Sequence, residues 1–104
     1  HLGSDINLVF DPGRVQGLPV ATITAPDGLQ MAVTTDQPGA QVYTAGWLRP
    51  QSGGLPGQEI GPAMGLCFEP QGFPNAVNLP QFPSVMVTPE KPYRQTLRLD
   101  FGWI

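Results

Sequence analysis

Residues 93–101 read YRQTLRLDF, and this stretch decides the fold class. Polar and apolar side chains alternate along it with a period of two, which is the pattern of a β-strand with one buried face. The face predicted to be buried carries Tyr93, Gln95, Leu97, Leu99 and Phe101, and the other carries Arg94, Thr96, Arg98 and Asp100. A half-buried antiparallel strand has this composition.

Outward from this stretch, glycine and proline divide the chain into short segments. The longest runs without either residue, 29–37 and 93–101, are too short for ordinary helices and lack a helical period. Turn sequences such as Pro26-Asp27-Gly28 and Asp36-Gln37-Pro38-Gly39 separate the segments, and Asp36 is predicted to be a turn former rather than a ligand. The predicted strands are 5–10, 20–25, 29–35, 41–44, 64–69, 85–88 and 93–101. About seven such strands predict an all-β chain that forms an antiparallel β-sandwich or part of one.

Composition limits the classes of protein and partner. The 104 residues make one domain at most, with 12% charged residues and a net charge of −3. Because the chain has no basic patch, we expect neither nucleic acid nor membrane as a partner. No apolar run approaches the roughly 20 residues of a membrane span, and no signal-peptide pattern is present. A cytoplasmic location is therefore expected.

The single cysteine, Cys67, and the single histidine, His1, exclude an internal disulfide and the usual zinc sites. We expect no metal and no cofactor. Cys67 has no basic neighbour in sequence to activate it, so burial as a small apolar side chain is predicted. Residues 49–62 are rich in glycine and proline and are predicted to form a flexible surface loop, with a lid over a site as the alternative.

Glu69 is the carboxylate with the most suggestive neighbours, because it lies between Phe68 and Pro70. Apolar surroundings disfavour the charged form of a carboxylate, which is one way in which proteins tune a general base toward neutral pH. Local composition alone favours a solvated glutamate at the end of a strand. A role as a base depends on the rest of the chain.

Several ordered segments resemble the C-terminal third of the aldose 1-epimerase (galactose mutarotase) family. They are Asp5-Ile6-Asn7, residues 34–44 (TTDQPGAQVYT), residues 65–78 (GLCFEPQGFPNAVN), Phe82-Pro83 and residues 89–94 (PEKPYR). Within them the chain departs from the family pattern at Ile6, Pro70 and Asn75, where the family has histidine, threonine and aspartate. The spacing of the segments covers nearly the whole chain.

The resemblance implies a β-supersandwich, of which residues 1–104 would be one β domain or the C-terminal portion. It implies the interconversion of the α and β anomers of free hexoses without a cofactor. By position, Glu69 matches the general base, and Asp5 and Gln41 match residues that bind the sugar. The acid histidine of the family lies upstream of these segments, and the position of His1 does not match it.

Three interpretations remain open. In the first, the chain belongs to an epimerase of this type and is inactive by itself because the acid is missing. In the second, it is a non-catalytic carbohydrate-binding β module. In the third, it acts only when assembled, and exposed strand edges favour self-association or association with the missing N-terminal portion. Trp47 and Trp103 are candidates for stacking on a sugar ring, with a core or interface role favoured for Trp103.

Overall fold

A computed structural model describes residues 3–104 of the chain, and these residues form strands and loops. The elements are β1 (Asp5–Val9), β2 (Ala21–Thr24), β3 (Leu29–Thr35), β4 (Gly39–Tyr43), β5 (Cys67–Gln71), the 3-10 turn η1 (Ala76–Asn78) and β6 (Leu97–Trp103). The predicted all-β class is confirmed. Among the described residues, no helix has the length and apolar character that crossing a bilayer requires.

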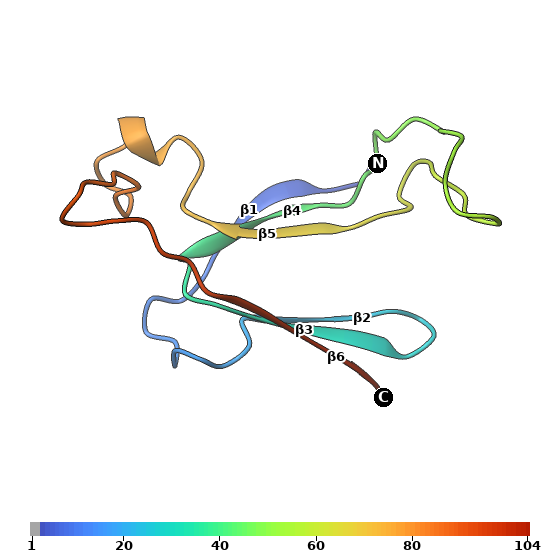
Figure 1. The fold of residues 1–104 in the computed structure, drawn as a ribbon, viewed down its shortest axis with the longest axis horizontal. Helices are drawn as coiled ribbons and strands as arrows, with labels where there is room; N and C mark the ends of the chain where they lie inside the picture. Colours follow the sequence, from blue (N-terminus) through green and yellow to red (C-terminus); the bar gives the residue numbers. More distant parts are fainter. Residues whose placement is uncertain (1–2) are drawn as a thin grey trace.

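The strands form two antiparallel three-stranded sheets, one with the order β1-β4-β5 and the other with the order β2-β3-β6. In Figure 1 the two sheets lie one above the other, as in a β-sandwich. The chain changes sheets between β1 and β2, between β3 and β4 and between β5 and β6, and the crossing between β3 and β4 is the shortest. The predicted turn at residues 36–39 therefore connects the two layers.

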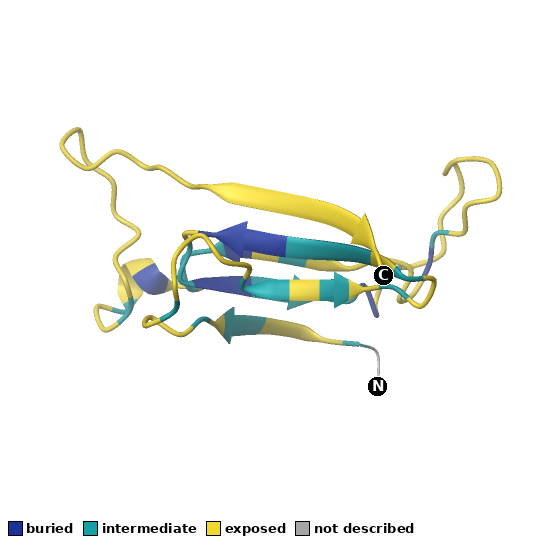
Figure 2. Ribbon diagram, turned by 90° about the horizontal axis from the view of Figure 1, so that it is seen from below, coloured by how far each residue is buried: buried dark blue, intermediate teal, exposed yellow. Residues whose placement is uncertain are grey.

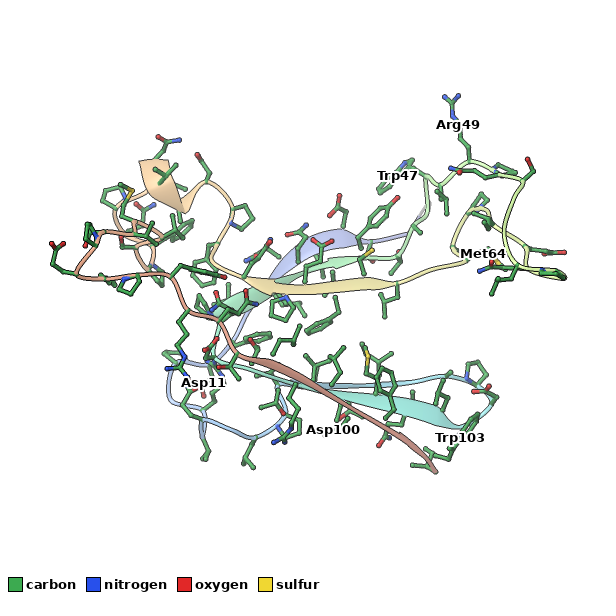
Figure 3. The ribbon with its side chains drawn as sticks, in the orientation of Figure 1. Asp11, Trp47, Arg49, Met64, Asp100 and Trp103 are labelled. Atoms are coloured by element: carbon green, nitrogen blue, oxygen red, sulfur yellow. The ribbon has the colours of Figure 1, made fainter. Side chains whose placement is uncertain are left out.

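Alternation along the strands gives each sheet an inner and an outer face. Asp100 points away from the β1-β4-β5 sheet in Figure 3, so its neighbours Leu99 and Phe101 belong to the inner face of β6. Trp47 lies on the far side of the β1-β4-β5 sheet, away from β2-β3-β6. Because Trp47 stacks on Tyr43, the face of β4 that carries Tyr43 is the outer face.

The interior is small. The aliphatic side chains buried among the described residues are those of Val33, Ala40, Ala45 and Ala76, and Pro70 is buried beside them. The radius of gyration is 16.5 Å, whereas a compact domain of this length has about 13 Å. The accessible surface is 7716 Å², which is about 2,000 Å² more than a compact monomer of this mass exposes. Much apolar surface is therefore left uncovered by the chain itself.

The half-buried face predicted for residues 93–101 is wrong. All seven residues of β6 are exposed, and Figure 2 shows this strand running along one margin of the molecule. The alternation is real, because Leu97 and Leu99 stand opposite Thr35 and Val33 of β3 on one face. That face extends beyond the small interior, so Phe101 stays 66% exposed.

Two other predicted strands differ from the structure. Residues 85–88 form no strand, although Thr88 makes an isolated bridge to Lys91. The strand predicted at 64–69 is β5, displaced toward the C-terminus so that it includes Pro70. Proline is tolerated there because β5 is an edge strand and the proline nitrogen, which carries no hydrogen, need not face β4. The outward carbonyl of Pro70 accepts a hydrogen bond from Gln95 Nε2 at 2.9 Å.

Candidate functional site

The antiparallel register of the first sheet places three polar side chains in one row. Gln41 on β4 stands opposite Asn7 on β1 and opposite Glu69 on β5. Residues that are directly opposite in antiparallel strands carry their side chains on the same face, with Cβ atoms about 5 Å apart. The row Asn7–Gln41–Glu69 therefore spans all three strands of this sheet.

Asp5 joins the row through a side-chain hydrogen bond. Gln41 Nε2 donates to Asp5 Oδ1 at 2.6 Å, although 36 positions separate the two residues in sequence. Asp5 stands opposite Tyr43, so it is the diagonal neighbour of Gln41 on the same face. The structure thus brings together the three residues predicted as site residues, Asp5, Gln41 and Glu69. Their roles remain predictions.

Two buried acceptor oxygens lie in this row. Asn7 Oδ1 and Gln41 Oε1 are both inaccessible to solvent, and neither has a hydrogen-bond partner among the described residues. Buried polar atoms are normally paired, and an amide oxygen accepts hydrogen bonds from hydroxyl groups. Asn7 was not singled out from the sequence as a site residue. The alternation that placed it on one face with Asp5 was the available signal.

Glu69 is exposed, so the apolar environment predicted for it is wrong. Phe68 and Pro70 flank it in sequence, but successive side chains of a strand point to opposite faces. Phe68 and Pro70 therefore lie on the inner face while Glu69 lies on the outer face. The carboxylate faces solvent beside Gln41.

Cys67 also lies on the outer face, opposite Tyr43, as the alternation predicted. Its predicted burial is wrong, because the thiol is free and the residue is exposed. The reason is the position of β5 at the edge of a sheet whose outer face is open.

An aromatic pair adjoins the polar row. The rings of Tyr43 and Trp47 are stacked, with centroids 6.4 Å apart and planes 8° from parallel. Tyr43 is two positions along β4 from Gln41, so it shares the outer face. The outer face of this sheet therefore carries a carboxylate pair, two amides and an aromatic platform.

Comparison with known proteins identifies the family of this chain. A profile of the aldose 1-epimerase family matches residues 1–100. The chain belongs to the aldose 1-epimerase family. It is 38% identical to galactose mutarotase of Rattus norvegicus over 100 residues, which are 96% of the chain and 29% of that protein. It is 38% identical to galactose mutarotase of Homo sapiens over 103 residues, which are 98% of the chain and 30% of that protein.

A shorter match, to galactose mutarotase of Sus scrofa, has 40% identity over 78 residues, which are 75% of the chain and 23% of that protein. The chain thus spans about three-tenths of the length of the galactose mutarotases of Rattus norvegicus and Homo sapiens. The predicted resemblance to the family is confirmed.

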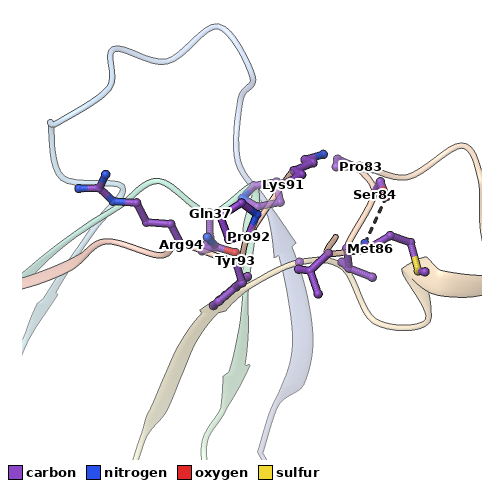
Figure 4. Close-up of a pocket in the computed structure, with 12 residues that line it drawn as sticks. Gln37, Pro83, Ser84, Met86, Lys91, Pro92, Tyr93 and Arg94 are labelled. Carbon is purple, nitrogen blue, oxygen red and sulfur yellow. Dashed lines mark hydrogen bonds between the residues drawn. The ribbon is translucent and has the colours of Figure 1, made fainter. Parts of the chain in front are cut away.

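Two hollows formed by the described residues lie apart from the polar row. One, of about 260 Å³, is lined by residues that include Gln37, Val85, Lys91 and Tyr93 (Figure 4). Another, of about 500 Å³, lies in the loop around Ile60. Neither contains Asp5, Gln41 or Glu69. We place the candidate site at the polar row on the chemistry of its side chains.

Asp36 is the carboxyl whose pKa departs from its ordinary value. Partial desolvation is the largest single influence and raises its pKa, but the hydrogen bonds from the Gln37 side chain and from Thr96 together prevail and lower the pKa from its ordinary value of 3.8. Asp36 Oδ2 accepts from the Thr96 backbone N–H at 2.9 Å. This carboxylate therefore joins the turn between the sheets to the segment that precedes β6, as the predicted turn role suggests.

Within residues 3–104, no group of three or more His, Cys, Asp or Glu side chains is arranged to hold a metal ion. His1, which was not favoured as the acid, lies outside the described residues. The loop at 49–62 is joined across its base by a bridge between Gln51 and Ile60, and its mobility and lid role remain predictions.

Proposed function

We propose that this chain supplies the base side of the sugar site in an aldose 1-epimerase that interconverts the α and β anomers of free hexoses such as galactose and glucose. The register of the first sheet carries the proposal, because it aligns Glu69 with Gln41 and thereby with Asp5. Family membership supports the reaction class, and the galactose mutarotases among the relatives support galactose as one substrate.

The chemistry requires two proton transfers. Glu69 accepts the proton of the anomeric hydroxyl while an acid outside the described residues donates a proton to the ring oxygen. The bond from C1 to the ring oxygen breaks and C1 becomes a carbonyl. Rotation about C1–C2 followed by closure on the other face gives the second anomer, and the two protons return. Asp5, Gln41 and Asn7 hold hydroxyl groups of the sugar during these steps.

Polarimetry tests this function. The natural polypeptide that carries these residues is expected to accelerate mutarotation of freshly dissolved α-D-galactose, and the 104-residue chain by itself is expected to be inactive. Inactivity is expected because the chain holds a single histidine, His1, which does not match the family acid. Acceleration by the isolated chain that persists in Glu69→Gln would contradict the assignment of the base.

A carbohydrate-binding module without catalysis is the second candidate. It is favoured by one observation: the exposed carboxylates of Asp5 and Glu69 flank Gln41 on one face, and binding hydroxyl groups there requires no acid. Calorimetry with D-galactose separates the candidates. Saturable binding by the natural polypeptide without faster mutarotation favours the module. Binding together with faster mutarotation favours the epimerase.

We also propose that the exposed inner face of β6 is covered by the remaining part of an epimerase-type polypeptide, and by a second copy when the chain is alone. The chain as a whole exposes about 2,000 Å² more than a compact monomer of its mass, and the inner face of β6 is part of this excess. Exposed apolar faces of this kind are covered by partners in stable proteins. Leu99 and Phe101 lie on this face.

Light scattering of the 104-residue chain over a range of concentrations tests the association. We expect oligomers, and we expect Phe101→Lys to weaken them. Val9→Lys is the matched control, because Val9 is 67% exposed and Phe101 is 66% exposed, but Val9 lies on the outer face of the other sheet. A monomer at every concentration would refute the proposal.

A further inference from the structure

The turn that carries Trp47 is held firmly although the indole itself is open to solvent. Trp47 is 56% exposed. The backbone carbonyl of Ala45 accepts hydrogen bonds from Leu48 N at 3.1 Å and from Ala63 N at 2.9 Å. Ala45 is buried and has a φ of 53°, and Ala63 has a φ of 58°. Ala45 lies in the turn that carries Trp47, and Ala63 lies in the segment bonded to it. A left-handed backbone is costly for a residue other than glycine, so both conformations persist because their surroundings fix them.

The fixed turn places the indole beside the polar row. Trp47 stacks nearly parallel on Tyr43, and Tyr43 stands opposite both Asp5 on β1 and Cys67 on β5. Tyr43 is two residues along β4 from Gln41, so the stacked rings begin next to the row Asn7–Gln41–Glu69 on the same face. In Figure 3, Trp47 stands out on the side of the sheet away from β2-β3-β6, which is the side of the row.

A hexose needs both kinds of surface. Its hydroxyl groups form hydrogen bonds with carboxylates and amides, and its carbon-bound hydrogens form an apolar patch that packs against an aromatic face. Asp5 and Gln41 supply the first surface next to the second. An exposed aromatic ring on a preorganised backbone loses little entropy when it binds.

We propose that the Tyr43–Trp47 stack is the aromatic wall of a monosaccharide subsite, in which Trp47 packs against the carbon-bound hydrogens of the sugar whose hydroxyls bind Asp5 and Gln41. This inference rests on the proposed function and adds a residue that sets affinity rather than the proton transfers. Trp47 is a positioning residue, since it has no group that titrates in the reaction.

Fluorine NMR reports directly on the wall. The natural polypeptide is labelled with 5-fluorotryptophan, and the Trp47 and Trp103 signals are assigned by their loss in Trp47→Phe and Trp103→Phe. D-galactose is expected to shift the Trp47 signal saturably and to leave the Trp103 signal in place. D-sorbitol, which has hydroxyls but no ring, is expected to shift neither. Trp103 is the reference because it lies on the other sheet, on the same face of β6 as Phe101 and away from the polar row.

Substitutions give a second, independent readout. Trp47→Ala is expected to weaken galactose binding by threefold to tenfold and to raise KM similarly, with kcat nearly unchanged. Trp47→Phe is expected to restore most of the affinity, and Trp103→Ala to leave it unchanged. Thermal unfolding of each variant establishes that it is folded.

The outcomes separate this inference from the proposed function. If galactose binds and is epimerised, yet the Trp47 signal does not move and Trp47→Ala binds as tightly as the natural protein, the wall is refuted and the function stands. If galactose neither binds nor is epimerised by the unsubstituted polypeptide, both are refuted. A shift of the Trp47 signal together with the loss of affinity supports the wall.

Discussion

The two sheets of this chain have opposite distributions of polar and apolar surface. The β1-β4-β5 sheet presents an outer face of carboxylates, amides and aromatic rings, and its inner residues Ala40 and Pro70 are buried. The β2-β3-β6 sheet has an apolar inner face on which Val33 is fully buried and Phe101 is largely exposed. The second sheet thus has more apolar surface than the first sheet covers.

The contrast separates two kinds of unsatisfied surface. Exposed carboxylates such as those of Asp5 and Glu69 on either side of an amide suit a small ligand with hydroxyl groups. Exposed apolar side chains in a continuous face indicate a protein partner, because burial of such a face yields about 25 cal/mol per Å². Substitutions in one sheet should therefore change sugar chemistry, and substitutions in the other should change assembly.

The largest effect is expected for Glu69→Gln. Loss of the base should lower the rate of mutarotation by about 100-fold to 10,000-fold, and the free energy of unfolding should hardly change because Glu69 is exposed. Polarimetry and thermal unfolding of the natural polypeptide measure the two quantities. Glu90→Gln, another exposed glutamate that lies in a turn, is the control. If Glu69→Gln and Glu90→Gln catalyse mutarotation at equal rates, Glu69 is not the general base.

The next effect is expected for Gly39→Ala, which breaks the first sheet. A Cβ at Gly39 would collide with the backbone carbonyl of Leu8 and would press on the ring of Phe73. We expect the free energy of unfolding to fall by about 1–3 kcal/mol. Gly102→Ala in β6 is the control, since a Cβ there meets no atom within 4 Å. Urea unfolding measures both, and a neutral Gly39→Ala would mean that β1 and β4 pair more loosely.

A smaller effect is expected for Gln41→Leu, which removes the donor to Asp5 and one buried acceptor. Sugar binding should weaken about tenfold, since one hydrogen bond that involves a charged group contributes about 1.5 kcal/mol or more. Gln30→Leu is the control, because the Gln30 amide donates to Thr24 at 3.2 Å in the other sheet. Calorimetry that finds the two variants equal would show that the outer faces do not differ in this respect.

The smallest effect is expected for Asp36→Asn at the connection between the sheets. The pKa of Asp36 is lower in the folded chain than its ordinary value of 3.8. Its contribution to stability is therefore present above pH 3.8 and is lost as the pH falls through the lower folded pKa. Asp36→Asn should cost slightly more stability at pH 6 than at pH 2.5. The stability loss differs little between the two pH values because Asp36 is exposed. A stability loss that is larger at pH 2.5 than at pH 6 would contradict this prediction.

The sequence could predict what depends on alternation and turns. The strand at Leu29–Thr35 has the predicted bounds, and the turn at residues 36–39 lies where it was expected. Alternation also placed Asp5, Asn7 and Cys67 on the correct faces of their strands. The family follows from short ordered segments, because their residue types and spacing are specific.

What depends on burial could not be predicted, since alternation shows which residues share a face but not what covers that face. Phe101 and Cys67 were both expected to be buried and are exposed. Phe68 and Pro70 suggested an apolar environment for Glu69. Successive side chains of a strand point to opposite faces, so these two neighbours do not surround the carboxylate. The stack of Tyr43 and Trp47 depends on the turn at Ala45, which no alternation reveals.

Pro70 has a consequence for the direction in which the sheets can grow. Along the outer edge of β5 it offers no N–H, and its carbonyl is already occupied by Gln95 Nε2. A strand that approached this edge would find neither a donor nor a free acceptor at its centre, so addition there is disfavoured. In the described structure, the edge strands β1, β2 and β6 contain no proline. Any strand from a partner would therefore extend the sheets at those edges. Assembly is thereby directed away from the strand that carries Glu69, which leaves room beside the carboxylate for a small molecule.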